Sequence, residues 1–176
     1  MGTRSGSIDP AIVSYVCRQT GETAEDVTRT LNQLSGLKGV SDGDSDMRSV
    51  LDRASKGDKV AALAVEMFVY ILAKHIAAMS VPVFSYGEEQ CGIDAIVFSA
   101  GIGENSPIIR ERTLKFLSPI FRFQLDHVLN SQNGKYSDGV ISKASSEVSD
   151  NTATVLVVAT DEEAMICQEC CSLVNK

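Results

Sequence analysis

The stretch FSAGIGENSPIIRER, residues 98–112, joins the end of an apolar run to the start of a helix. The run CGIDAIVFSAG, residues 91–101, predicts a buried strand, because it is short, contains β-branched and aromatic residues and ends in glycine. Ser106 followed by Pro107 predicts the helix start. Gly-x-Gly between these elements leaves backbone N–H groups uncovered beside a helix N-terminus, which favours a phosphate or a polar ring. On spacing alone an ordinary tight turn fits equally well, because a lone Gly-x-Gly is a weak signal.

Three polar residues follow the glycines at this corner: Glu104, Asn105 and Ser106. The short side chains of Asn105 and Ser106 are typical helix caps, so one of them is expected to cap the helix. The carboxylate of Glu104 is expected to accept hydrogen bonds from a ribose, since an ionised carboxylate only accepts.

A second apolar strand, TATVLVVAT, is predicted at residues 152–160. It runs directly into DEEAMICQECCSLV, residues 161–174, which predicts a C-terminal helix. Between the two strands, Asn133-Gly134 is a turn signal. Strand and helix therefore alternate in the second half of the chain, which predicts the α/β fold class.

The first half of the chain predicts helices. Asp9-Pro10 is a helix start, and the Thr23 hydroxyl is expected to cap a second helix that stops at Gly36. Residues 37–48 have the Gly, Ser and Asp content of a loop. A long helix follows at about residues 58–79, and because it is apolar nearly all round it is expected to be buried.

Composition argues against a nucleic-acid binder. The 176 residues are 44% hydrophobic, enough for one domain with a core or for a large part of a two-domain protein. Lys and Arg number 16 against 23 Asp and Glu, a formal net charge of -7. Such a surface repels a phosphate backbone, although a nucleotide site needs only a few local donors and a metal ion.

The sequence predicts a cytoplasmic protein without a membrane span. Residues 1–10, MGTRSGSIDP, lack the apolar stretch of a signal peptide. The longest apolar run, residues 60–79, contains Glu66, Lys74 and His75, which favours a core helix over a membrane span. Five cysteines in this context favour reduced thiols.

Four segments carry a more specific signal than spacing does. They are the opening MGTRSGSIDP, then SGLKGVSDGDSDMR, IDAIVFSAGIGENSPIIRE and VLVVATDEEAMI, which are spread along essentially the whole chain, from residue 1 to residue 166. In this order they resemble the acetate kinase family. The resemblance implies part of an actin-like ATPase domain of the ribonuclease H-like fold, and a phosphoryl transfer between ATP and acetate that depends on Mg²⁺.

The resemblance also implies roles for individual residues. Arg4 is expected to stabilise the transferring phosphoryl group, whose charged oxygens suit a guanidinium. Glu162 is expected on the Mg²⁺ side of the site, since Mg²⁺ prefers carboxylate oxygens. Asp46, Met47 and Arg48 would flank the adenine, with the guanidinium stacked on the ring. The residues expected to hold the nucleoside are Gly101, Ile102, Gly103, Glu104 and Asn105.

Each of these residues has a plainer interpretation. Arg4 fits a solvated arginine in a floppy N-terminus. Residues 46–48 fit a helix N-terminus capped by Asp44 or Ser45. The carboxylates at 161–163 would all suit the positive end of a helix dipole.

The chain departs from the family pattern in several ways. Ser7 stands where the family usually has an acid, and residues 124–152 form a longer excursion. The family's Asn-x-Gly-Ser-Ser-Ser and His-Leu-Gly-Asn-Gly loops have no counterpart, and its catalytic aspartate and histidines are missing. His75 and His127 match none of those histidines and are expected to be structural.

Acetate kinases are more than twice this length, so the chain resembles their C-terminal part, begun at an internal methionine or cut from a longer protein. Residues 1–161 are expected to form an incomplete nucleotide-binding domain, and the helix at 162–176 to pack on the missing N-terminal domain. The chain alone is expected to be inactive. In the whole protein the substrates would be acetate and acetyl phosphate, the cofactors ATP/ADP and Mg²⁺, and the partner a second copy.

Two alternatives to an acetate kinase stay open. One is a non-catalytic module that binds nucleotide or dimerises, and the other is a propionate or butyrate kinase fragment. A metal site is disfavoured for the three cysteines of the last helix, because three sulfurs on one turn do not close a four-ligand zinc site. They are expected instead to be buried in the core. These are Cys167, Cys170 and Cys171.

Overall fold

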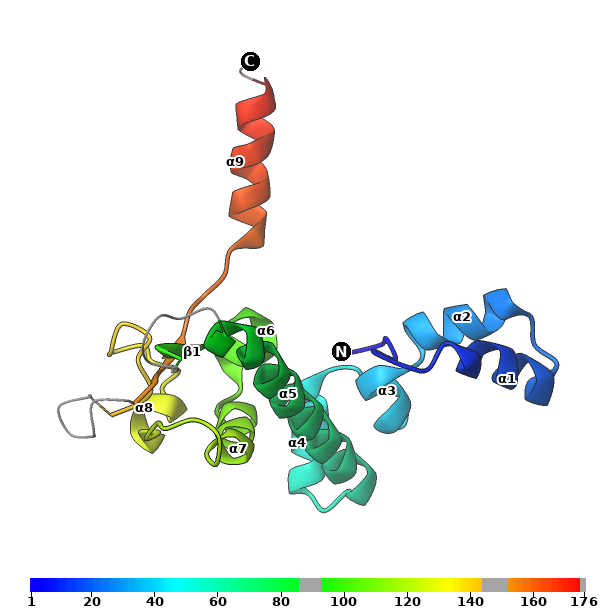
Figure 1. Ribbon diagram of the computed structural model, residues 1–176, viewed down its shortest axis with the longest axis horizontal. Coiled ribbons are helices and arrows are strands. Elements are labelled where there is room, and N and C mark those ends of the chain that lie inside the picture. The colour runs from blue at the N-terminus through cyan, green and yellow to red at the C-terminus, as the bar shows by residue number, and fades with distance from the viewer. Residues whose placement is uncertain (86–92, 144–151, 175–176) are drawn as a thin grey trace. The chain divides into compact units, whose positions relative to one another are not determined.

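We describe residues 1–85, 93–143 and 152–174 of the chain in a computed structural model (Figure 1). The chain divides into two compact units, Met1–His75 and Ile76–Lys176. The division lies inside one long helix, whereas the boundary expected before the last helix lies within the second unit. That expected boundary stays a prediction, and each unit is described by itself.

The helix starts of the first unit follow the predicted caps. The Ala11 N–H donates to the Asp9 carboxylate at 2.8 Å, and the Asp26 N–H donates to the Thr23 hydroxyl at 3.2 Å. Both predicted starts are confirmed. The helices are α1 Ala11–Thr20, α2 Ala24–Gln33, α3 Gly36–Val40, α4 Met47–Ser55 and α5 Lys59–Ser85, which continues into the second unit.

The end of α2 differs from the prediction, and so does the segment after it. α2 ends at Gln33, and Gly36 begins α3, which runs on into the segment predicted as a loop. Gly36 has a φ of 60°, and a Cβ there would lie 2.6 Å from the carbonyl oxygen of Arg4. This close approach lets Leu37 donate its N–H to the Met1 carbonyl at 3.0 Å. Glycine is therefore required for contact with the N-terminal segment, and the prediction of a helix stop was wrong.

Helix α5 buries one face only, so the prediction of a helix buried nearly all round was wrong. By length and composition alone α5 could cross a membrane: its most apolar window has a mean hydropathy of 1.7, and 28% of that window is buried. This is weak evidence for a membrane span, because core helices of other proteins meet the same criteria. The buried apolar residues are Ala61, Ala64, Val65, Val69 and Ala73. The exposed ones include Val60, Leu63, Met67 and Ile71.

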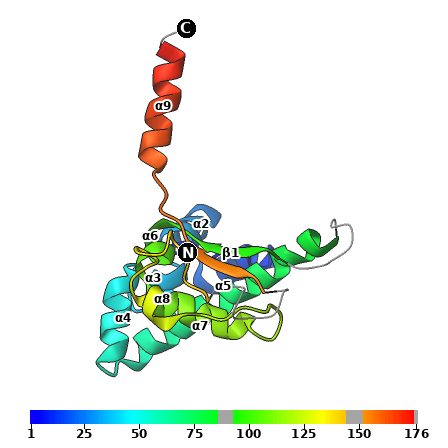
Figure 2. The same cartoon turned by 90° about the vertical axis from the view of Figure 1, so that its left-hand side faces the viewer.

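The second unit contains a parallel pair of strands, which confirms the α/β class. β1 Ala95–Phe98 pairs in register along its length with β2 Thr154–Val157, and the strands lie side by side in Figure 2. In β1, Ile96 is buried while Val97 is 52% exposed, so the strand is buried on one face. Both strands are shorter than the predicted runs, and residues 91–92 of the first run lie outside the described residues.

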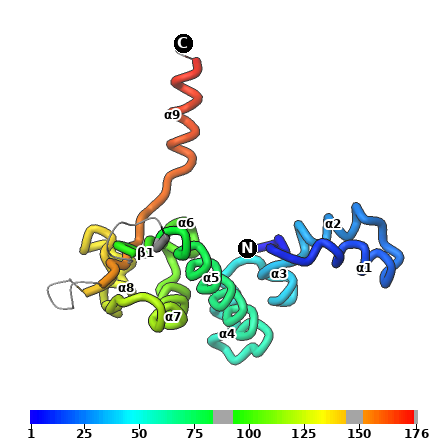
Figure 3. Tube along the Cα trace, viewed as in Figure 1, coloured from blue at the N-terminus to red at the C-terminus, as the bar shows by residue number. Residues whose placement is uncertain are grey.

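The helices of the second unit follow the strands. α7 begins at Pro107 as predicted, and the turn at Asn133-Gly134 is confirmed by left-handed φ values of 55° and 68°. The chain passes from β2 into the last helix (Figure 3). All described side chains of this helix are exposed. The helices are α6 Ala100–Asn105, α7 Pro107–Leu117, α8 His127–Ser131 and α9 Glu162–Val174.

Candidate functional site

The carboxyl ends of β1 and β2 lie at one edge of the sheet, because the strands are parallel. α6 follows β1 at this edge, and residues 158–162 follow β2. The Val158 N–H donates to the Phe98 carbonyl at 2.9 Å, so the two main chains stay together past the end of β2. Open α/β sheets bind ligands at this edge. Two predicted groups, the Gly101–Asn105 corner and Glu162, lie on the segments that leave it.

The corner after β1 is a short helix rather than an open loop. Ala100 turns the chain with a φ of 58°, a conformation that costs a non-glycine residue about 1 kcal/mol or more. The Asn105 side chain donates to the Gly101 carbonyl at 2.9 Å. Neither Asn105 nor Ser106 supplies a side-chain cap to α7, so that prediction was wrong. A Cβ on Gly101 would meet no described atom within 4 Å, so open space faces this residue.

Glu104 joins the corner after β1 to the corner after β2, which is formed by residues 158–162. Its Oε1 accepts one hydrogen bond from the Thr160 N–H and one from the Thr160 hydroxyl, both at 3.0 Å. One carboxylate oxygen is thus engaged by protein, while the expected contact with a ribose stays a prediction. Sequence reasoning missed Thr160, although it ends the apolar run predicted as a parallel strand, and a polar residue at that end falls at the edge where such sheets bind ligands.

Glu162 begins α9 and is exposed. Asp161, and not Glu162, accepts the capping hydrogen bond, from the Ala164 N–H at 2.9 Å. Among the residues that the structure describes, no group of three His, Cys, Asp or Glu side chains is gathered to hold a metal ion. An exposed carboxylate near the sheet edge still suits Mg²⁺, which takes one or two carboxylates together with phosphate oxygens and water.

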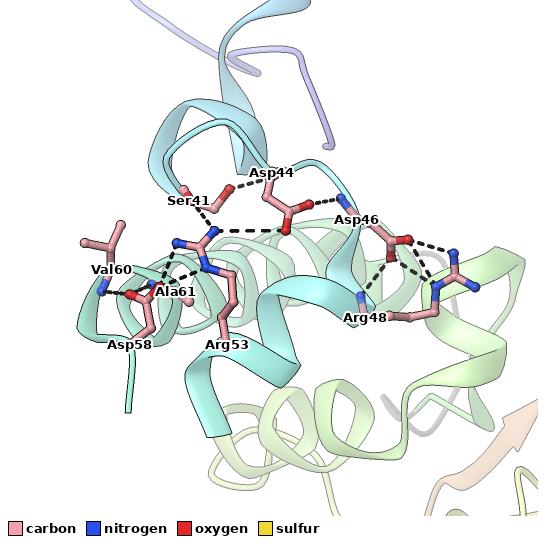
Figure 4. A network of polar contacts seen from close by, with 8 residues as sticks. All are labelled: Ser41, Asp44, Asp46, Arg48, Arg53, Asp58, Val60 and Ala61. Carbon is pink, nitrogen blue, oxygen red and sulfur yellow. Dashed lines mark hydrogen bonds and ion pairs between the residues drawn. The ribbon is translucent and has the colours of Figure 1, made fainter. Parts of the chain in front are cut away.

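Asp46 and Arg48 of the first unit form an ion pair at the start of α4 (Figure 4). Asp46 caps the helix, accepting from the Arg48 N–H at 2.9 Å, so the alternative cap at Asp44 or Ser45 was wrong. The Arg48 Nη2 lies 2.7 Å from the Asp46 carboxylate, while the arginine side chain stays 87% exposed. These hydrogen bonds from Arg48 lower the pKa of Asp46 to about 2. Met47 between them is buried.

Arg53 supports the turn that carries this pair, and sequence reasoning missed it. Its Nη1 donates to the Ser41 carbonyl at 2.8 Å, and its Nη2 lies 2.7 Å from the Asp58 carboxylate (Figure 4). Asp44 accepts from the Asp46 N–H at 3.0 Å. The segment that the sequence presented as a loop is therefore fixed at both ends. An arginine among several aspartates was the available signal.

The segment around Arg4 is fixed by backbone hydrogen bonds, so the alternative of a floppy N-terminus was wrong. Ser5 donates its N–H to the Leu31 carbonyl at 2.8 Å, and Ser35 donates to the Thr3 carbonyl at 2.9 Å. The Arg4 side chain is exposed. A fixed backbone with an exposed guanidinium suits the predicted role toward a phosphoryl group, which stays a prediction.

The cysteines of α9 are exposed, so the expectation of buried core cysteines was wrong for the described chain. The reason is that none of the described residues of α9 is buried. His75 and His127 are exposed as well. The cysteines concerned are Cys167, Cys170 and Cys171.

A parallel strand pair, with a helix after each strand, places the second unit in the class of α/β proteins. The chain belongs to a known family of that class: the profile described as "Acetokinase family" matches residues 1–168. The resemblance seen in the sequence is confirmed.

Curated relatives cover the whole chain. It is 42% identical over 175 residues to the acetate kinase of Anoxybacillus flavithermus, covering 99% of this chain and 40% of that protein. It is 43% identical over 174 residues to the acetate kinase of Carboxydothermus hydrogenoformans, and this match also covers 99% of this chain and 40% of that protein. The chain therefore spans about 40% of the length of these relatives.

Solved structures agree with the fold. A propionate kinase from Francisella tularensis has a TM-score of 0.80 and 38% identity, covering 96% of this chain and 39% of that one. The acetate kinase of Porphyromonas gingivalis has a TM-score of 0.79 and 31% identity, covering 99% and 40%. The chain thus has the mixed α/β structure of the part of these kinases that it matches, about 40% of their length.

Proposed function

We propose that this chain carries the adenosine-binding part of an acetate kinase. In the whole protein a phosphoryl group would pass between ATP and acetate, giving ADP and acetyl phosphate. The observation that supports this most directly is the joined pair of corners, where Glu104 is bound to Thr160 and open space faces Gly101. Main-chain groups at such an edge suit a nucleoside that lies against the backbone.

Each predicted residue then has a defined task. Gly101–Asn105 hold the nucleoside, and the exposed, planar guanidinium of Arg48 stacks on the adenine. Arg4 stabilises charge on the transferring phosphoryl group. Phosphoryl transfer asks little covalent chemistry of a protein, so positioning and charge stabilisation carry the rate.

Mg²⁺ would neutralise phosphate charge, and Glu162 is the residue proposed to lie on its side of the site. Glu162 is exposed at the start of α9, the first helix after β2, and an exposed carboxylate suits a Mg²⁺ ion that also binds phosphate oxygens and water. The chain alone is expected to show negligible turnover, because it spans about 40% of its relatives.

The same proposal extends to the localisation and the partners of the protein. The protein is cytoplasmic, acts on small molecules and forms a homodimer, without nucleic acid or membrane as a partner. The net charge of -7 supports the first of these exclusions.

A second candidate is a propionate kinase, because one similar structure is of a propionate kinase. Turnover of the longest natural form of the protein with acetate, propionate and butyrate separates the two. A higher kcat/KM with propionate would favour the second candidate.

Calorimetric titration of this chain with MgADP tests the proposal. We expect binding that weakens about five- to thirtyfold in Arg48→Ala, since a stacked guanidinium contributes on the order of 1–2 kcal/mol. Arg29→Ala is the matched control, because Arg29 is also exposed and paired with a nearby aspartate, Asp26, on another helix. Absence of binding to the unaltered chain, or equal binding in both variants, would contradict the assigned site.

A further inference from the structure

Arg110 of α7 is a buried arginine whose guanidinium is saturated with hydrogen bonds. The residue is 0% exposed. A guanidinium has five N–H donors, and every one is used. Nε donates to the Asn130 side-chain oxygen at 2.8 Å, and Nη2 donates to the Asn130 carbonyl and the Asn133 side-chain oxygen, both at 2.7 Å. Nη1 donates to the carbonyls of Gly103 at 2.7 Å and Glu104 at 3.0 Å.

The acceptors around Arg110 are all neutral. Each is a backbone carbonyl or an amide oxygen, so dipoles alone balance the buried charge within the described part of the chain. Burial lowers the pKa of the guanidinium accordingly. A buried charge without a counter-ion is less favourable than a well-packed apolar side chain of similar volume. Core filling by itself therefore does not explain an arginine at this position.

The two carbonyls that Nη1 binds belong to the end of α6. The last carbonyls of a helix lack intrahelical partners, and a basic side chain can bind them. Arg110 thus caps α6 from the neighbouring helix. The other side of its guanidinium is anchored to residues 130–133, where Asn130 is 2% exposed and Asn133 has a left-handed φ of 55°.

We propose that Arg110 is a positioning residue for the Gly101–Asn105 corner, and that residues 130–133 set the shape of the corner through it. The inference rests on the proposed function, because the shape of the corner affects ligand binding only if a nucleoside binds there. Arg110 itself touches no ligand. Its hydrogen bonds to the carbonyls of Gly103 and Glu104 hold the end of α6, so the corner is ordered before a ligand binds. Binding then costs less conformational entropy.

Asn133→Gly tests this link with little risk to the turn. Glycine accepts the left-handed φ of Asn133, so the substitution removes one acceptor of Arg110 and leaves the backbone unstrained. Asp138→Gly is the matched control, since Asp138 also has a positive φ, 51°, nearby in the same segment. Asn133→Asp keeps an acceptor oxygen and serves as the conservative rescue.

Amide hydrogen exchange reports the corner directly. The Ser106 N–H donates to the Ile102 carbonyl, and the Thr160 N–H donates to Glu104, both at 3.0 Å. We expect both amides to exchange about fivefold faster in Asn133→Gly, because the loss of about one net hydrogen bond changes the opening equilibrium by about that factor. In Asp138→Gly they should exchange as in the unaltered chain, and in Asn133→Asp no faster, because a carboxylate there still accepts from Arg110 and adds a counter-ion.

The same variants are titrated with MgADP. Affinity should fall about fivefold in Asn133→Gly and stay unchanged in Asp138→Gly. Equal corner exchange in the two glycine variants would overturn the role of Arg110. So would equally faster exchange at Ser118, at the far end of α7, since that marks general destabilisation. If the unaltered chain does not bind MgADP, the proposed function fails for this chain, and the exchange comparison still decides the role of Arg110.

Discussion

Asp46 and Arg48 show how closely two neighbouring side chains depend on each other. The carboxylate caps α4 and accepts hydrogen bonds from the guanidinium, which lowers the pKa of Asp46 and raises that of Arg48. Pairing leaves the guanidinium exposed, so its face stays open to a flat ring. The same arginine therefore orders its own helix start and is available to a ligand.

The pH dependence of Asp46 follows from this pair. Its pKa is lowered from 3.8 to about 2, so its contribution to stability is fully present above pH 3.8 and is lost as the pH falls through about 2. A carboxyl NMR titration should give a midpoint of about 2, which rises toward 3.8 in Arg48→Ala. Arg29→Ala should leave the midpoint unchanged. A midpoint near 3.8 in the unaltered chain would rule out the ion pair in solution.

At the scale of elements, α3 and the N-terminal segment hold each other in place. Lys38 donates its N–H to the Gly2 carbonyl at 2.9 Å, and Leu37 donates to Met1 at 3.0 Å. These contacts need the close approach at Gly36. The position of Arg4, far from α3 in sequence terms, thus depends on a glycine.

Gly36→Ala should destabilise the first unit by about 2 kcal/mol or more, because a Cβ would overlap backbone and also force an unfavourable φ. That Cβ would lie 2.6 Å from the Arg4 carbonyl oxygen and 2.7 Å from that of Met1. Urea unfolding measures the loss. Gly57→Ala is the control, with a φ of 92° but nothing within 4 Å, and should cost only about 1 kcal/mol. Equal losses would show that no steric contact operates at Gly36.

At the scale of the whole molecule, α9 differs from the other long helices because every one of its described side chains is exposed. None of its described residues is buried, although Met165, Ile166 and Leu173 are apolar. The chain spans about 40% of the length of its relatives. Packing of this helix on an N-terminal domain stays a prediction.

Removing residues 162–176 should therefore change the unfolding free energy by less than about 0.5 kcal/mol, as for other exposed groups. Circular dichroism during urea unfolding measures this free energy. Leu117→Ala is the control, because it leaves a cavity at a buried core position and should cost about 2–5 kcal/mol. A loss of that size on truncation would mean that α9 packs on this chain in solution.

Local signals in the sequence predicted much of the fold. The caps at Asp9 and Thr23 and the turn at Asn133-Gly134 were predicted correctly, because each depends on a few neighbouring residues. Long-range contacts escaped prediction. Gly36 resembled a helix stop, since nothing local reveals a backbone that approaches it from the N-terminus.

The candidate site divides in the same way. The sequence by itself determined the family, the α/β class and the segments that carry the predicted residues, since motif and periodicity are written along the chain. Tertiary structure alone decided that Glu104 is bound to Thr160 and that Arg110 holds the end of α6. Glu104 and Thr160 lie far apart in sequence, and the pairing of the parallel strands brings them together. Arg110 lies close in sequence to the carbonyls that it binds, but its burial against Asn130 and Asn133 is a long-range contact that no local signal reveals.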